Sequence, residues 1–183
     1  MNRPLSTIVL LLTCLSGLQE IYAQALPTAT APGAYISVGG TCSFFQSGYG
    51  QQVLAGTSAF ADINPRRQVG IEAEGRWLQQ DRLSKITEAT YLIGPRAQIR
   101  RGRYSPYVKT LIGLGHFGFP YNYATGRYFV VAPGAGVDLS IGEDLKIRLI
   151  DVEYQEWPQF TFGTLSGFGI SFGLSYRIFN GSR

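Results

Sequence analysis

Few side chains in this sequence could carry catalytic chemistry. His116 is the only histidine, and therefore the only possible imidazole base. Nucleophilic catalysis would also need a hydroxyl and an orienting group within hydrogen-bond reach of that base. Ser166 and Thr125 could supply the hydroxyl, but neither stands at a spacing typical of a catalytic motif. The sequence therefore favours a protein that is not an enzyme.

Motifs for cofactors and metals are incomplete. The segment Gly113–Gly118 spells G-x-G-x-x-G, but a dinucleotide-binding loop needs a helix after it, and Pro120 with an aromatic stretch follows instead. Of the two cysteines, Cys14 lies in the first 25 residues and Cys42 stands alone beyond them, so no paired-cysteine zinc site exists. We predict no cofactor and no metal.

The elements that position the remaining polar residues show a period of two. From residue 34 onward, large apolar residues alternate with small or polar ones. Such alternation predicts β-strands, because successive side chains of a strand point to opposite faces. The connections between the segments are alternately long and short, as in an up-and-down meander. The expected strands are 34–45, 53–64, 68–78, 86–99, 106–118, 128–140, 145–157 and 166–179.

The composition of the two strand faces decides what surrounds the barrel. One face carries bulky apolar residues, and the other carries mainly glycine, serine and charge. Glycine is a poor choice for a water-facing strand position but suits the crowded interior of a narrow barrel. The pattern predicts an all-β fold, an eight-stranded antiparallel up-and-down transmembrane β-barrel, with a soluble ligand-carrying barrel as the alternative. Aromatic residues near strand ends, among them Tyr35, Tyr107 and Trp157, are expected in two belts at the lipid headgroups.

The N-terminal segment and the composition indicate where the barrel resides. Residues 1–25 combine Arg3, an apolar stretch and the small-x-small sequence Ala23–Ala25, which predicts a cleavable signal peptide. Residues 26–33 are expected to form a short periplasmic lead-in, and residues 34–183 an outer-membrane barrel. The net charge of +4 is not gathered on a basic stripe, so nucleic acid is excluded as a partner.

The last expected strand carries a resemblance to a known family. In the segment Ser171–Phe179, Gly173 is followed at +3 and +5 by Tyr176 and Ile178. This ending resembles the closing strand of bacterial outer-membrane barrels, and the whole mature chain resembles the small OmpA-like, eight-stranded barrels labelled "porin family". The resemblance implies outer-membrane lipids and lipopolysaccharide as surroundings. It also implies that the barrel-assembly machinery recognises Gly173, Tyr176 and Ile178.

The alternation also predicts which charged side chains face the lumen. Isolated charges in a confined interior cost several kcal/mol each, so five cations and six anions are expected to pair in a network that plugs the barrel. Glu72, Glu74 and Arg76 are expected to form one ladder within it. A β-bulge near residues 149–150 is needed to bring the charges of the seventh strand into phase. The expected lumen residues are Glu72, Glu74, Arg76, Glu88, Arg96, Lys109, Asp138, Arg148, Asp151, Glu153 and Arg177.

These features predict a non-enzymatic outer-membrane barrel with a structural or surface-interaction role. A surface ligand would be contacted by the outer loops, such as Phe119–Ala124 and Gln159–Thr164. One alternative is a narrow channel or carrier for small or hydrophobic molecules, which a hydrophobic lumen would favour. The third is a lipid-modifying enzyme, which a buried polar contact to His116 would favour.

Overall fold

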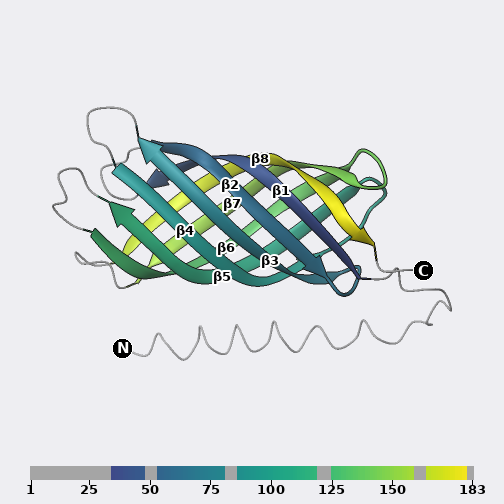
Figure 1. The fold of residues 1–183 in the computed structure, drawn as a ribbon, viewed down its shortest axis with the longest axis horizontal. Helices are drawn as coiled ribbons and strands as arrows, with labels where there is room; N and C mark the ends of the chain where they lie inside the picture. Colours follow the sequence, from purple (N-terminus) through teal and green to yellow (C-terminus); the bar gives the residue numbers. More distant parts are fainter. Residues whose placement is uncertain (1–33, 48–52, 81–85, 119–124, 159–163, 181–183) are drawn as a thin grey trace, which may run out of the picture. The chain divides into compact units, whose positions relative to one another are not determined.

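Eight strands form a closed antiparallel barrel in the computed structural model, which describes residues 34–47, 53–80, 86–118, 125–158 and 164–180. Each strand pairs with the next one along the chain, and β1 pairs with β8 to close the sheet (Figure 1). The strands are β1 (Tyr35–Ser47), β2 (Val53–Asn64), β3 (Val69–Gln80), β4 (Ile86–Gln98), β5 (Tyr104–Gly118), β6 (Thr125–Ser140), β7 (Leu145–Trp157) and β8 (Leu165–Asn180).

The eight expected strands are therefore confirmed, with ends that differ by a few residues. Within the described ranges, no helix is both long and apolar enough to cross a membrane. The expected signal peptide and lead-in, residues 1–33, lie outside the described residues, as do most residues of the four long connections.

The alternation of side chains gives the barrel an apolar outer surface and a polar interior. On β3, Ile71 and Trp77 are exposed on the outside, whereas Glu72, Glu74 and Arg76 are buried inside. On β8 the same rule exposes phenylalanine, leucine and tyrosine and buries serine. An outward apolar band with an inward polar set is the pattern of a transmembrane barrel.

The expected irregularity in β7 is present. The register against β8 shifts between Arg148 and Asp151, and Leu149 and Ile150 are both exposed on the outside, at 38% and 37%. Two consecutive outward residues reverse the phase of the strand. Arg148, Asp151 and Glu153 consequently all point into the lumen.

Four aromatic residues contradict the expected belts, and one of them, Tyr128, is half-buried against apolar side chains inside the barrel. The other three, Tyr35, Tyr107 and Trp157, are only 5%, 3% and 2% exposed and lie inside the barrel. The phase of their strands points them inward, and glycines on other strands leave room for two of the rings. The ring of Tyr107 lies against Gly136, and the indole of Trp157 lies against Gly115. Position near a strand end was therefore a misleading guide for these four residues.

A side chain at Gly115 should disturb this packing. A Cβ atom there would overlap the indole of Trp157, which is held in a buried cluster with Leu92 and Val130. We expect Gly115→Ala to lower the free energy of unfolding by about 1–3 kcal/mol, as over-packed cores do. Urea unfolding in phospholipid vesicles measures the loss. Gly142→Ala is the matched control, because a Cβ atom at Gly142 meets nothing within 4 Å; equal stability of the two variants would contradict the expectation.

Candidate functional site

The barrel interior gathers most of the charged side chains of the strands. Ten of the eleven expected lumen residues are buried there: Glu72, Glu74, Arg76, Glu88, Arg96, Lys109, Asp138, Arg148, Asp151 and Glu153. Asp62 and Lys146 are buried as well and were missed by the sequence reasoning. Their phase could have revealed them, because Asp62 alternates with outward residues as Ser58 does, and Lys146 shares the phase of Arg148.

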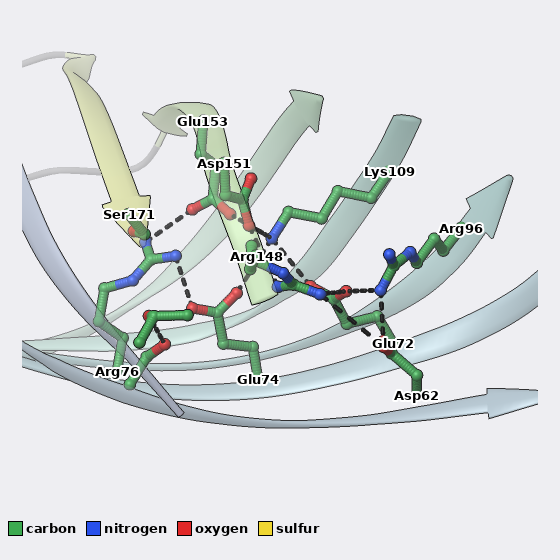
Figure 2. A network of polar contacts seen from close by, with 12 residues as sticks. Asp62, Glu72, Glu74, Arg76, Arg96, Lys109, Arg148, Asp151, Glu153 and Ser171 are labelled. Atoms are coloured by element: carbon green, nitrogen blue, oxygen red, sulfur yellow. Dashed lines mark hydrogen bonds and ion pairs between the residues drawn. The ribbon is translucent and has the colours of Figure 1, made fainter. Parts of the chain in front are cut away.

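Lys109 on β5 lies at the centre of four carboxylates. Its Nζ atom is 2.8 Å from Glu72 and 2.7 Å from Asp151, which lie on β3 and β7. Glu74 and Glu153 are slightly farther away, at 3.2 and 3.3 Å (Figure 2). Glu72, Glu74 and Asp151 approach one another closely enough to ligate a metal ion. The Lys109 ammonium supplies the positive charge among them.

Two arginines join the carboxylates on the short-turn side of Lys109. Arg96 contacts Asp62 at 2.6 Å, Glu72 at 2.9 Å and Asp138 at 2.5 Å. Arg148 contacts Glu72 at 3.0 Å, and also Asp151 and Asp138 at 3.2 and 3.4 Å. Glu72 is therefore shared by three cations from three different strands, which ties β3 to β4, β5 and β7 (Figure 2).

Aromatic rings cover the flat faces of the guanidinium groups. Phe60 lies under Arg148, with the guanidinium carbon 3.7 Å from the ring centre, and Tyr107 lies under Arg96 at 3.8 Å. An arginine over a ring face is attracted by the quadrupole of the ring, most strongly where both groups are desolvated. The inward aromatic residues thus fill space that the charged side chains leave and stabilise the cations.

Arg76 forms the part of the network nearest the long loops. Its two terminal nitrogens contact Glu74 and, across the lumen, Glu153, each at 2.7 Å. The expected ladder of Glu72, Glu74 and Arg76 is therefore only partly present, since Glu72 pairs with other cations. Alternation assigns a residue to a face, but the pairing across the lumen depends on how the strands are staggered around the barrel.

Two of the expected lumen residues do not join these ion pairs. Glu88 is buried, but it makes no ion pair with another described residue, and its Oε1 atom has no hydrogen-bond partner among them. Arg177 is half-buried near the short turns, where its guanidinium lies 4.8 Å from the ring centre of Tyr35. The structure brings nine of the eleven expected residues into one connected network, together with Asp62.

The lumen becomes apolar toward the long loops. On β5 and β6 the inward residues on that side of the charges are aliphatic, aromatic or glycine, whereas β4 contributes Leu92 next to the polar Thr90 and Glu88. The apolar side chains pack with the ends of β7 and β8 in a cluster of Leu92, Leu111, Val130, Ala132, Trp157 and Leu165. A second apolar cluster contains Phe45, Leu54 and Leu78.

The two strands that close the barrel contribute hydroxyl groups to the interior, and their one charged residue is Arg177 on β8. Thr41 on β1 lies 2.6 Å from Ser58, oxygen to oxygen, and the Ser171 hydroxyl on β8 donates to Ser43 on β1 at 2.8 Å. Among the described residues, no ion pair involves a side chain of β1 or β8.

The three residues expected to form an assembly signal lie on β8. A Cβ atom at Gly173 would overlap the backbone of Gly40 and Thr41 on β1, so the close approach of the two strands requires glycine there. Tyr176 and Ile178 are exposed on the outer surface. Their recognition by the assembly machinery stays a prediction.

His116 has no catalytic surroundings in the described part of the chain. Its side chain is exposed on the outer surface of β5, opposite Ala89 on β4 and Arg127 on β6. Ser166 lies on β8, which does not neighbour β5, and Thr125 pairs with Gly118. The structure therefore does not bring Ser166 and the imidazole together, and the side chain of Thr125 lies outside the described residues.

Comparisons with known proteins support the fold. No protein-family model matches the sequence, and no curated protein resembles it closely enough to count as a relative. Among solved structures, Neisserial surface protein A matches with a TM-score of 0.65 at 9% identity, over 81% of this chain and 99% of that one. OprG from Pseudomonas aeruginosa matches at 0.57 and 11%, over 82% and 98%.

A third similar structure is Ail, the attachment invasion locus protein of Yersinia pestis. It matches with a TM-score of 0.54 at 16% identity, over 81% of this chain and all of that one, and it has also been solved with the heparin analogue sucrose octasulfate. At such low identities the likeness concerns the fold. The expected all-β class, an eight-stranded antiparallel transmembrane β-barrel, is confirmed.

Proposed function

We propose that this chain is a non-enzymatic outer-membrane β-barrel whose lumen is plugged by paired charges and whose role is structural or surface-interactive. The observation that carries the proposal is the network around Lys109, in which side chains from β3, β5 and β7 meet across the lumen. An eight-stranded barrel is only wide enough for its own side chains to fill it. A network of this kind occupies the cross-section of the barrel with paired side chains in place of a water-filled pore.

Conductance is the test of the plug. We expect the wild-type protein, reconstituted in a planar bilayer, to give no steady openings of the size that a water-filled porin gives. Heat-modifiable gel migration of the same sample establishes that the protein is folded. Steady porin-sized openings from folded protein would overturn the proposed plug.

The alternative of a carrier for hydrophobic molecules finds little support. It would need free space in the apolar part of the lumen, near Leu111 and Trp157. Those side chains are buried against one another, with Leu111 fully buried and Trp157 nearly so. The apolar clusters are therefore better explained as packed side chains between the charges and the long loops than as a ligand cavity.

Surface recognition is assigned to the long loops, which transmembrane barrels expose outside the cell. Their central residues, 48–52, 81–85, 119–124 and 159–163, lie outside the described residues. The structure of Ail in complex with a heparin analogue gives a precedent for ligand binding by a protein of the same fold. Shortening 119–124 should leave the barrel intact, because its backbone hydrogen bonds run between strands, and should remove binding to the surface partner.

The remaining proposed partners follow from the outer-membrane location. They are the lipids and lipopolysaccharide of that membrane, and the barrel-assembly machinery acting on Gly173, Tyr176 and Ile178. A signal peptide over residues 1–25 would deliver the chain. Replacement of Tyr176 and Ile178 by serine should slow assembly in cells more than folding of the purified chain into vesicles, which pulse-chase labelling can compare.

A further inference from the structure

The outer surface of β4, β5 and β6 carries a basic pair near the long loops. Arg127 is the only exposed lysine or arginine among the strand residues whose side chains the structure describes. It stands directly across the β5–β6 ladder from His116, which is also exposed. A cation on the lipid-facing surface is costly unless it reaches the membrane interface or an anion. Arg127 is two residues from the start of β6, where the interface is expected.

The ladder beneath this pair becomes steadily more apolar. One row deeper, Tyr91, Leu114 and Phe129 lie side by side. One row deeper still, Ile93 lies beside Ile112. The side chains of Tyr91, Ile93, Ile112 and Leu114 line a groove of about 670 Å³ that reaches up to His116 and Arg127. From His116 to Ile112 the groove runs about 13 Å along the strand, at about 3.3 Å per residue.

Aromatic residues mark the same level as the interface. Trp77 pairs with Ala89, which in turn pairs with His116, so the indole lies in the row of the basic pair. Its Nε1–H donates to the Tyr91 hydroxyl at 3.2 Å. Tryptophan and tyrosine collect at the headgroup level of membranes, where the ring is apolar and the polar tip is wet.

No carboxylate of the described strands competes for the pair. Glu156 is the only exposed acidic residue among them, and it stands beside Val131, four residues along β6 from Arg127. Glu88 precedes Ala89 on β4, but its side chain points into the lumen. Within the described strands, the surface therefore presents a positive charge with no adjacent carboxylate directly above an apolar groove.

From this arrangement we infer that the β4–β6 surface binds a phosphate-bearing, acylated lipid of the outer leaflet, an inference that rests on the proposed outer-membrane location. The phosphate lies between Arg127 and His116, and one acyl chain lies in the groove over Leu114 and Ile112. A guanidinium binds phosphate through two parallel charge-assisted hydrogen bonds, which a lipid headgroup at the interface can accept. The small side chain of Ala89 leaves the entrance beside His116 open.

Quenching of Trp77 by brominated lipids tests the site. Trp77 is exposed beside the groove, whereas Trp157 is buried in the lumen, so lipid contact reports mainly on Trp77. The protein is reconstituted in phosphatidylcholine vesicles that contain either brominated phosphatidic acid or brominated phosphatidylcholine. We expect wild type to prefer phosphatidic acid. Arg127→Gln should reduce this preference about fivefold, the equivalent of the ~1 kcal/mol that one basic residue contributes at an anionic membrane surface.

The controls separate this site from the barrel itself. Arg101→Gln, in an exposed turn at the opposite end, should keep the wild-type preference, and inorganic phosphate should not displace the lipid because it has no acyl chain. Wild-type protein that does not insert into vesicles would overturn the proposed function. Inserted protein with no preference for phosphatidic acid, or with a preference that Arg127→Gln keeps, would overturn the lipid site alone. If both lipids quench equally and the protein self-associates, the groove is a contact between copies of the chain. That result would also overturn the lipid site.

Discussion

Replacing Lys109 by methionine is expected to lower the free energy of unfolding by about 3–5 kcal/mol, the cost of removing one partner from a buried ionic cluster. Methionine is close to lysine in volume and removes the ammonium, with its charge and its hydrogen bonds to the carboxylates. Glu72 and Asp151 would then face Glu74 and Glu153 without the ammonium that separates them. The buried anions already outnumber the buried cations among the described residues, and Lys146 and Arg177, which make no ion pair there, lie against the Tyr35 ring and not beside these carboxylates.

Urea unfolding in vesicles, followed by the gel mobility of unheated samples, measures this loss. Adding Glu74→Gln to Lys109→Met should recover part of it, because less uncompensated charge remains and neighbouring changes are not additive. Arg101→Met removes a cation from an exposed turn and should change little. A Lys109→Met protein as stable as wild type would show that the network does not stabilise the barrel.

Phe172→Arg is expected to impair insertion into membranes. Phe172 is 46% exposed on the outer surface near the middle of β8, where it pairs with Cys42 on β1. An arginine on the lipid face costs about 2–4 kcal/mol near the midplane of the bilayer. The fraction of protein that reaches the folded form in vesicles should fall strongly, whereas Phe172→Leu keeps the face apolar and should fold as wild type does.

A substitution at the adjacent residue separates the cost of placing a charge in lipid from the cost of crowding the lumen. Ser171 is buried and donates to Ser43 in the lumen, so Ser171→Arg introduces no charge into lipid. The effect of Ser171→Arg should come from overpacking of the interior, so Ser43→Gly should relieve it. Ser43→Gly should not relieve the effect of Phe172→Arg. Equal folding of Phe172→Arg and Phe172→Leu would show that residue 172 does not face lipid.

The fold could be predicted because a strand imposes its period on every residue. Eight long alternating segments fix eight strands, and the chemistry of the two faces distinguishes lipid from water outside. Even the bulge in β7 was predictable, because Arg148 and Asp151 cannot both face the lumen in a regular strand. The order of residues along the chain is enough to predict features of this kind.

The pairing inside the lumen could not be predicted in the same way. The carboxylate that Arg76 meets across the lumen depends on how the strands are staggered around the barrel. This stagger brings Glu153 of β7 to Arg76, and not Glu72 of its own strand. The inward position of Trp157 was missed for a related reason, since closeness to a loop says nothing about the phase of a residue. The face on which a residue lies is set by its own strand, whereas its partner in the lumen is set by the closed barrel.

The hydroxyl-lined junction between β1 and β8 has a consequence for how the barrel closes. These strands join the residues most distant in the sequence, so their pairing carries the largest loop-closure entropy and depends on the other strands being in place. Every ion pair among the described residues is made by β2 to β7, which neighbour one another in the sequence. The electrostatic interior can therefore be complete while the sheet is still an open, curved ribbon. The final step then brings together backbone, glycine and short hydroxyl side chains, with the rings of Tyr35 and Phe45 and the half-buried Arg177, and no ion pair among the described residues has to form as the edges meet.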